Sequence, residues 1–312
     1  MEFFALLAGL AGLWFGTEAT IRGAVALAQR LGIPEFAVGI AVLSIGSDLP
    51  ELSIAVDAAI KNLHGGRASD VVVGSAFGSD MGQIGLVLGI TGLFGYLSLP
   101  RNIIYQQGAA LLGSLVFLGL VGFDGHVSRT EGISLVFFYV LYLMYVLAGA
   151  VTLEKSGGWW ATRLASAFAY LIVGLVIVIA SAELTVWSTI QVAQTFDIEQ
   201  SIIAIIVIGL GTSLPELSIS VGAILKRRPD LSLGNLIGSN VFDTLVPVGV
   251  AASITRLDFN GDMLRHELPF LFVLTSVVLL FLIRKAGIQK RHAVIIIGMY
   301  LTYAVFRVQE VI

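Results

Sequence analysis

Cysteine is absent from this sequence of 312 residues, which excludes disulfide bonds, thiolate metal sites and cysteine nucleophiles. Charge is scarce as well, because only 12% of the residues are Asp, Glu, Lys or Arg, against about 25% in a soluble domain. No basic cluster with interleaved aromatic residues indicates a nucleic-acid partner. No G-x-x-x-x-G-K-[ST] loop is present, so nothing indicates a protein driven by a nucleotide.

Apolar residues, in contrast, make up 57% of the chain. Apolar runs of about 20 residues recur from end to end, which predicts an all-α polytopic membrane protein. The short alternating segments of a β-barrel are not seen. The first run lacks a positive n-region and a cleavage site, so we expect a membrane helix there rather than a signal peptide. The ten predicted spans are 3–28, 36–60, 70–97, 103–122, 130–152, 161–192, 200–225, 232–254, 267–285 and 292–308.

The two halves of the chain resemble each other. SIGSDLPELS in the first half matches GLGTSLPELS in the second, so that Glu51 corresponds to Glu216. Further on, GSAFGSDMG matches GNLIGSNVF. Five spans per half is an odd number, so the second half must enter the membrane in the opposite direction. We therefore expect two inverted five-helix repeats, at 1–152 and 161–312, joined by a short linker at 153–160.

The loop charges predict an orientation. Eleven Lys and Arg residues fall in loops on the side away from the termini, and six on the side of the termini. Positive loops are typically cytoplasmic, which predicts that both termini are extracytoplasmic. The short loops favour a prokaryotic plasma membrane.

Each matched motif carries a proline and a glutamate inside an apolar run. Pro50 and Pro215 lack an N–H and free a carbonyl four residues earlier, and such carbonyls are tolerated at membrane depth only beside a cavity or partner. Glu51 and Glu216 are costly in a bilayer, at about 2.5–3.5 kcal/mol each on insertion scales. The inversion places both near the midplane, facing each other. Carboxylates, hydroxyls and carbonyls together are ligands for a hard cation, and Ca²⁺ matches two negative charges.

The second matched segment adds polar groups to this site. We expect Ser79, Gln83, Ser239 and Asp243 to line it, since Asp243 is a further intramembrane charge. The four glycines Gly74, Gly78, Gly234 and Gly238 are interpreted as helix-packing positions. Asp80 and its counterpart Asn240 could line the site or point elsewhere, and the sequence favours neither alternative.

Glu18 and Glu183 are a further matched pair of acids. They could line a permeation path, or lie near an aqueous boundary. Pairing of Glu18 with Arg22, one helical turn later, is the favoured interpretation.

The motifs SIGSDLPELS, GLGTSLPELS, GSAFGSD and GSNVFD resemble the paired α-repeats of the sodium/calcium exchanger family, within the cation/calcium antiporter superfamily. The resemblance covers essentially the whole chain and is greatest to prokaryotic members without a large regulatory loop. It implies a secondary antiporter that exchanges Na⁺ for Ca²⁺ by alternating access, with the first and sixth spans sliding. Such a protein is not an enzyme and needs no cofactor. Its expected partners are the lipid bilayer and the ions Ca²⁺ and Na⁺, with no obligate protein partner.

The resemblance also implies individual ligands. Glu51 and Glu216 would bind Ca²⁺, with the carbonyls of Ser47 and Thr212. Flanking Na⁺ sites and a middle position would use hydroxyls, carbonyls and carboxylates from both repeats. These additional residues are Ser44, Asp48, Ser79, Gln83, Gly209, Ser213, Ser239 and Asp243.

Two positions depart from the family pattern, because Asp48 stands where Ser is common and Gln83 where Asn is common. Asp48 could be protonated at rest, bind a cation more tightly than a hydroxyl, or bring protons into the coupling cycle. H⁺/Ca²⁺ exchange, or exchange of another divalent cation, is therefore the main alternative. A channel is disfavoured by the broken helices of an inverted repeat. An intramembrane aspartyl protease could use paired acids, but family knowledge leads us to expect a Gly-x-Gly-Asp motif, which is absent.

Overall fold

A computed structural model describes residues 2–64, 69–150, 164–195, 213–259, 261, 263–285 and 287–311. Almost all of these residues are helical. The α-helices of the first half are α1 (Glu2–Leu31), α2 (Glu35–Val38), α3 (Ser44–Ser47), α4 (Leu49–Leu63), α5 (Ser69–Met81), α6 (Leu88–Phe94), α7 (Arg101–Val121) and α8 (Arg129–Ala150). Those of the second half are α9 (Leu164–Thr195), α11 (Leu214–Leu225), α12 (Pro229–Ile254), α13 (Leu268–Lys285) and α14 (Lys290–Val311). Three π-helical segments are η1 (Gly39–Leu43), η2 (Gly82–Val87) and η3 (Met263–Glu267), and a small sheet pairs β1 (His126–Val127) with β2 (Leu257–Asp258).

The prediction of an all-α membrane protein is confirmed, although the count of ten spans is not. Seven helices of the described residues are long and apolar enough to cross a membrane. An eighth span results if the bent pair Glu35–Ser47 and Leu49–Leu63 is counted as one. Only 213–225 of the predicted span 200–225 is described, and the predicted linker 153–160 lies outside the described residues. The division into two five-helix repeats stays a prediction.

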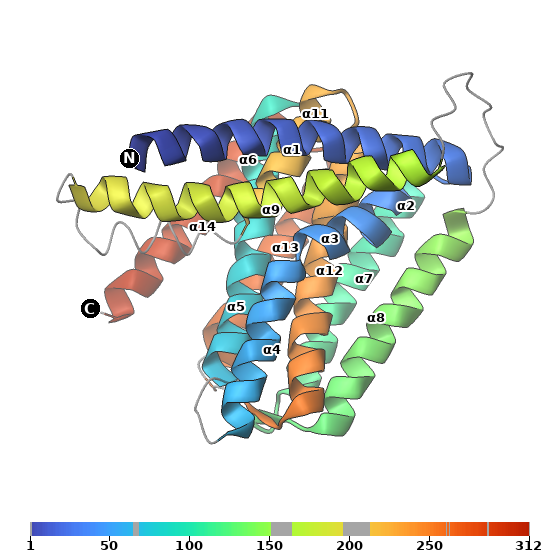
Figure 1. The fold of residues 1–312 in the computed structure, drawn as a ribbon. Helices are drawn as coiled ribbons and strands as arrows, with labels where there is room; N and C mark the ends of the chain where they lie inside the picture. The colour runs from blue at the N-terminus through green and yellow to red at the C-terminus, as the bar shows by residue number, and fades with distance from the viewer. Residues whose placement is uncertain are drawn as a thin grey trace.

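The helices α1 and α9 lie side by side and cross the remaining bundle at a steep angle (Figure 1). Glycines allow this close approach, because Gly16 and Gly23 of α1 and Gly174 of α9 each face the backbone of the opposite helix. Large apolar side chains such as Trp14 and Ile172 point outward, where acyl chains would surround them. The pair therefore forms a unit of its own beside the bundle.

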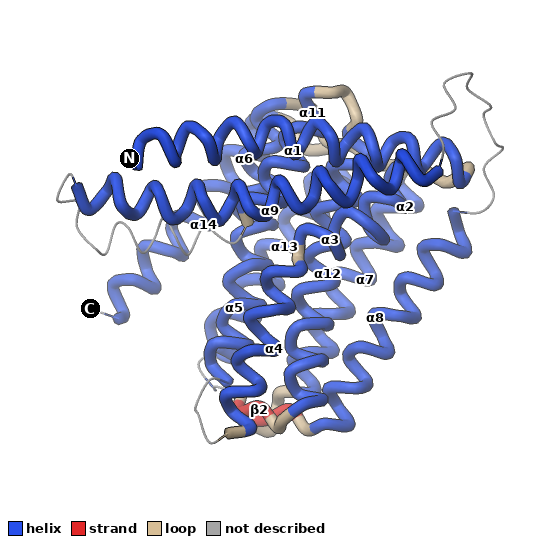
Figure 2. The backbone as a smooth tube through the Cα atoms, in the orientation of Figure 1, coloured by secondary structure: helices blue, strands red, loops and turns tan. Residues whose placement is uncertain are grey.

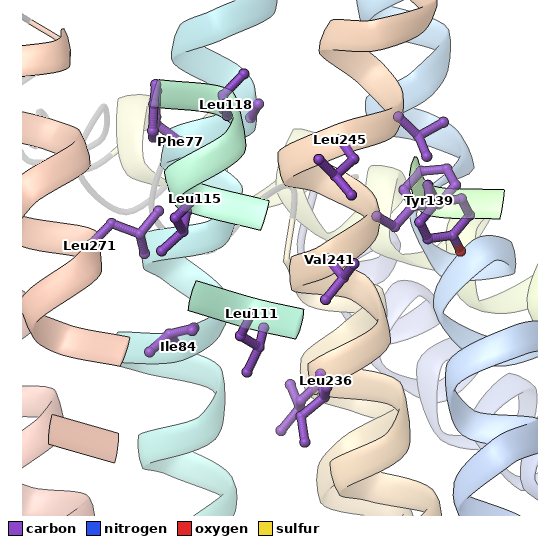
Figure 3. Close-up of a cluster of buried hydrophobic side chains, with 14 of the residues drawn as sticks. Phe77, Ile84, Leu111, Leu115, Leu118, Tyr139, Leu236, Val241, Leu245 and Leu271 are labelled. Atoms are coloured by element: carbon purple, nitrogen blue, oxygen red, sulfur yellow. The ribbon is translucent and has the colours of Figure 1, made fainter. Parts of the chain in front are cut away.

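The centre of the bundle is α12, whose residues from Leu231 to Gly249 are all buried. Leu111 and Leu115 of α7 lie on one side of α12, and Tyr139 of α8 lies on the other (Figure 3). The segment formed by α5, η2 and α6 is the second most buried span and also packs on α12. These two segments carry the second matched motif, so its polar side chains are held in the interior.

Connections gather at two ends of the bundle. At one end β1 pairs with β2, and the Ser69 hydroxyl accepts a hydrogen bond from the N–H of Asp258 at 3.2 Å. At the other end Leu97 pairs with Ile288, and Arg228 bonds Glu35 at 2.5 Å. The helix α4 runs toward the end with the sheet, and α11 lies at the opposite end (Figure 2). Opposite directions of the two matched helices are what an inverted repeat requires.

The packing interpretation of the glycines holds for the second repeat and fails for one glycine of the first. A Cβ on Gly238 would lie 2.8 Å from the Cα of Ile40, and Gly234 faces the backbone of Phe36 equally closely. Gly74 has only ordinary contact with Met263, at 3.4 Å, and Gly78 has no atom within 4 Å. The matched helices are therefore packed asymmetrically around the centre.

This asymmetry predicts that Gly238→Ala destabilises the protein while its counterpart Gly78→Ala does not. The new methyl at 238 must push the backbone of η1 away, at a cost of about 1–3 kcal/mol. Alanine at 78 meets open space and gains up to about 1 kcal/mol of helix propensity. Melting temperatures of the two purified variants in one detergent would test this. Equal melting temperatures would contradict the packing.

Candidate cation site

Two helices, α4 and α11, begin at the matched motifs. Asp48 ends α3 with φ −88° and ψ 6°, and the chain bends by 46° before α4. Ser213 precedes α11 with φ −93° and ψ 9°. The next two residues in each case are Leu and Pro, in the first helical turn, where an absent N–H removes no intrahelical bond. The same local sequence thus begins a helix with nearly the same backbone geometry twice.

Glu51 and Glu216 are the third residues of α4 and α11. Their side chains are only 2% and 0% exposed, and none of their four carboxylate oxygens has a hydrogen-bond partner. Because α4 and α11 begin here, the positive ends of two helix dipoles lie near these carboxylates. A buried unpaired carboxylate is costly, so these oxygens favour the approach of a cation.

Asp48 adds a third carboxyl group to this cluster. It is fully buried, three residues before Glu51. The Ser47 hydroxyl lies 3.4 Å from Asp48 Oδ1, while Oδ2 has no partner. An unpaired carboxylate oxygen in the interior is costly, so Asp48 also favours a proton or a cation beside it.

The second motif forms a hydrogen-bonded network between η2 and α12. Asp243 Oδ2 accepts bonds from the Ser79 hydroxyl at 2.6 Å and from Gln83 Nε2 at 2.9 Å. The Gln83 carbonyl in turn accepts a bond from Asn240 Nδ2 at 3.0 Å. Asp243 Oδ1 and the Ser239 hydroxyl are buried without partners. The network orients Asp243 so that one oxygen is bonded and the other is free.

Ten of the twelve sequence-predicted ligands belong to the described residues, and all ten are buried. Ser44 uses its hydroxyl to bond the Ile40 carbonyl at 2.5 Å, and Ser213 is 1% exposed at the break before α11. Gly209 and Thr212 lie outside the described residues. Three or more acidic or histidine side chains do not converge on a single ion position anywhere in the described chain. A cation here therefore needs carbonyl and hydroxyl oxygens beside the carboxylates.

Sequence reasoning missed two contributors to this region. Asn240 was undecided, yet it bridges to Gln83 from α12. Tyr139 of α8 was not considered, although its buried hydroxyl has no partner and lies beside Ser44 and Asp48. The buried residues of this otherwise lipid-facing helix recur at helical spacing, which was the available signal. They are Gly132, Leu135, Tyr139, Tyr142, Val146 and Ala150.

The matched acids Glu18 and Glu183 lie away from this cluster. Glu18 bonds Arg22 at 2.6 Å, so the predicted pairing is confirmed, and it also pairs with Lys226 at the start of the loop after α11. The Thr17 hydroxyl lies 2.6 Å from that of Ser218. Glu183 is exposed on α9. Glu18 therefore connects α1 to the bundle rather than lining the cluster.

Buried acids at two matched helix starts are typical of a class, the secondary transporters of cations. A family model described as "Sodium/calcium exchanger protein" matches residues 1–148 and 166–309. The chain belongs to the sodium/calcium exchanger family, whose members are membrane transporters rather than enzymes.

Individual relatives agree with this assignment. The chain is 31% identical to "Inner membrane protein YrbG" of Escherichia coli over 80% of this chain and 79% of that protein. It is 24% identical to "Sodium/calcium exchanger MaX1" of Methanosarcina acetivorans over 98% of both chains. The solved structure of the sodium-calcium exchanger NCX_Mj is similar with a TM-score of 0.82 and 26% identity, over 96% of both chains.

Proposed function

We propose that the protein exchanges Na⁺ for Ca²⁺ across the membrane by alternating access, with an oxygen-ligand cation site near the midplane. The observation that carries this proposal is the set of buried, unpaired carboxylate oxygens on Glu51 and Glu216 at two matched helix starts. Their combined charge suits Ca²⁺, and the carbonyls of Ser47 and Thr212 would supply further oxygen ligands. Relatives that are named as sodium/calcium exchangers support the same ions.

The remaining ligands divide between the two repeats in this proposal. Glu51 and Glu216 would each serve a flanking Na⁺ site as well. The first-repeat Na⁺ site would use Ser44, Ser47, Asp48 and Ser79, and the second-repeat site would use Gly209, Thr212, Ser213 and Ser239. Gln83 and Asp243 would line a middle position, which the free oxygen of Asp243 supports.

Alternating access needs one part of the protein to move against another. We assign this movement to α1 and α9, because they pack chiefly on each other through glycines and lie across the bundle (Figure 1). The pair of Glu18 with Lys226 would hold α1 to α11 in one state. Both termini would lie outside the cytoplasm of a prokaryotic cell, on the evidence of the loop charges.

The test is uptake of radioactive Ca²⁺ into proteoliposomes that contain the purified protein. An outward Na⁺ gradient at equal pH should drive uptake, whereas a pH gradient without Na⁺ should not. Choline replaces Na⁺ in the control vesicles. Absence of uptake under both gradients would contradict the assignment of Ca²⁺ as the transported ion.

H⁺/Ca²⁺ exchange is the second candidate, and the full burial of Asp48, three residues before Glu51, favours it. A proton bound to Asp48 would have to leave before a cation could use this carboxylate. Uptake driven by the pH gradient alone would establish this candidate and keep the same glutamates.

Asp48→Ser separates the two candidates at one residue. We expect Ca²⁺ uptake by the unaltered protein to fall as the pH is lowered, because protons compete with the cation for Asp48. The serine variant has no carboxyl group at this position and should show a flatter pH profile. Initial rates across a pH series, with Asp57→Asn on the exposed face of α4 as the matched control, measure the difference. Identical pH profiles for the unaltered protein and the serine variant would show that Asp48 does not bind the competing proton.

A further inference from the structure

A second polar pocket lies between α5, η2, α7, α12 and α13, on the far side of Asn240 from Gln83. Its polar lining consists of Asp80, Asn240, Thr244 and Thr275. Aliphatic side chains, among them Ile84 and Leu271, close it from several helices (Figure 3). Thr275 is 1% exposed and Asp80 is 2% exposed. None of these four residues is among the ligands assigned to the exchange site.

Three oxygen atoms in this pocket are buried without hydrogen-bond partners, and they are Asp80 Oδ1, Asn240 Oδ1 and Thr275 Oγ1. The Thr244 hydroxyl lies 2.7 Å from Asp80 Oδ2 and 2.7 Å from the Asn240 backbone carbonyl. Because a hydroxyl has a single proton, it satisfies only one of these acceptors at a time. The pocket therefore has more acceptors than donors.

Water cannot correct this imbalance, because the space between the side chains is too small for a water molecule. A proton on Asp80 could serve one further acceptor but would leave the others unchanged. A bare cation is smaller than a water molecule and takes several oxygen ligands, so it suits a small pocket rich in acceptors. Since the pocket contains one carboxylate and otherwise neutral oxygens, a single positive charge would neutralise it.

We propose that Asp80, Asn240, Thr244 and Thr275 form a separate binding site for a monovalent cation, with Na⁺ as the ion. The sequence shows how this site arose beside the first one. Asp80 and Gln83 in one repeat match Asn240 and Asp243 in the other, so acid and amide have exchanged places. The Asn240 amide donates a hydrogen bond to the Gln83 carbonyl oxygen, and Gln83 in turn donates to Asp243, whereas Asp80 accepts from Thr244.

The neighbouring residues Ser79 and Asp80 face different partners, which separates the two sites. The Ser79 hydroxyl bonds Asp243, whereas Asp80 bonds Thr244 one residue further along α12. An ion at Asp80 would hold α5, α12 and α13 together, because Thr275 comes from α13. Its binding does not depend on whether the protein transports Ca²⁺.

The test uses the full chain in detergent with Glu51→Gln and Glu216→Gln combined, so that Na⁺ binding at the exchange site is removed. A ligand that binds the folded state raises the melting temperature as its concentration rises. We expect NaCl to raise the melting temperature of this background variant, while choline chloride at equal ionic strength does not. Adding Asp80→Asn should remove the Na⁺ response. Adding Asp57→Asn, whose carboxylate is exposed on α4, should leave it intact.

A second variant keeps the test decisive if Asp80→Asn does not fold. Thr275→Val removes one neutral oxygen and should weaken the apparent Na⁺ affinity by about tenfold. No Na⁺ response in the background variant would overturn the proposal, as would an unchanged response after Asp80→Asn. A melting temperature that responds to pH and not to Na⁺ would assign the site to a proton instead. Failure of Ca²⁺ uptake in proteoliposomes would contradict the proposed exchange function and leave the proposed Na⁺ site untouched.

Discussion

Glu51→Gln and Glu216→Gln should each abolish Na⁺-driven Ca²⁺ uptake by the reconstituted protein. Each substitution preserves the shape of the side chain and removes one of two negative charges from a buried site. Loss of one charge about 4 Å from a cation costs about 4 kcal/mol at the effective dielectric constant of a protein. That energy corresponds to about a thousandfold loss of affinity. Initial rates of radioactive Ca²⁺ uptake under an outward Na⁺ gradient would measure the effect.

Asp57→Asn is the matched control for Glu51→Gln. It lies on the same helix α4, but its carboxylate is 63% exposed and pairs with Lys61 at 2.6 Å. Exposed pairs of this kind contribute about 0–1 kcal/mol, so the control should fold and transport normally. Normal transport by either glutamine variant, with the control also normal, would refute the assignment of that glutamate to the site.

The helix starts at the two motifs could be predicted from the sequence because their cause is local. A proline inside an apolar run kinks or breaks a helix, but it is tolerated in a first helical turn. The structure places Asp48 and Ser213 immediately before α4 and α11 with nearly the same backbone angles. Doubling of the motif predicts the inversion; α4 extends toward the end with the sheet, and α11 lies at the opposite end (Figure 2).

Contacts between distant segments were harder to predict, since they depend on how helices pack. The bond between Asn240 and Gln83 joins residues from two repeats, and no local pattern indicated which side chain would bridge them. Lys226, which follows α11, pairs with Glu18 of α1, and no local pattern in the sequence indicates this partner. Gly78 and Gly238 match in sequence, although only Gly238 faces a neighbouring backbone closely. Repetition in a sequence therefore did not guarantee equal packing.

The second large prediction concerns the orientation of Asp243. Asp243→Asn should slow uptake by about tenfold or more, because the transported ion would lose at least the equivalent of one hydrogen bond to a charged group. Ser79 and Gln83 both donate to Asp243 Oδ2. An asparagine would turn its carbonyl oxygen toward these two donors, because its NH₂ group cannot accept their bonds. The NH₂ group would then occupy the position of Oδ1, which is the free oxygen of the aspartate. Hydrogen-bond donors would face the position expected for a cation.

The prediction can be separated from a loss of folding by changing the donors. In Asp243→Asn combined with Ser79→Ala, one of the two donors that orient the asparagine is gone, so its carbonyl can turn toward the cation position more easily. We therefore expect the double variant to transport better than Asp243→Asn alone, even though Ser79 itself is a proposed ligand. Initial uptake rates and melting temperatures of both variants, measured together, test this reasoning. Full activity of Asp243→Asn would show that its free oxygen does not contact the transported ion.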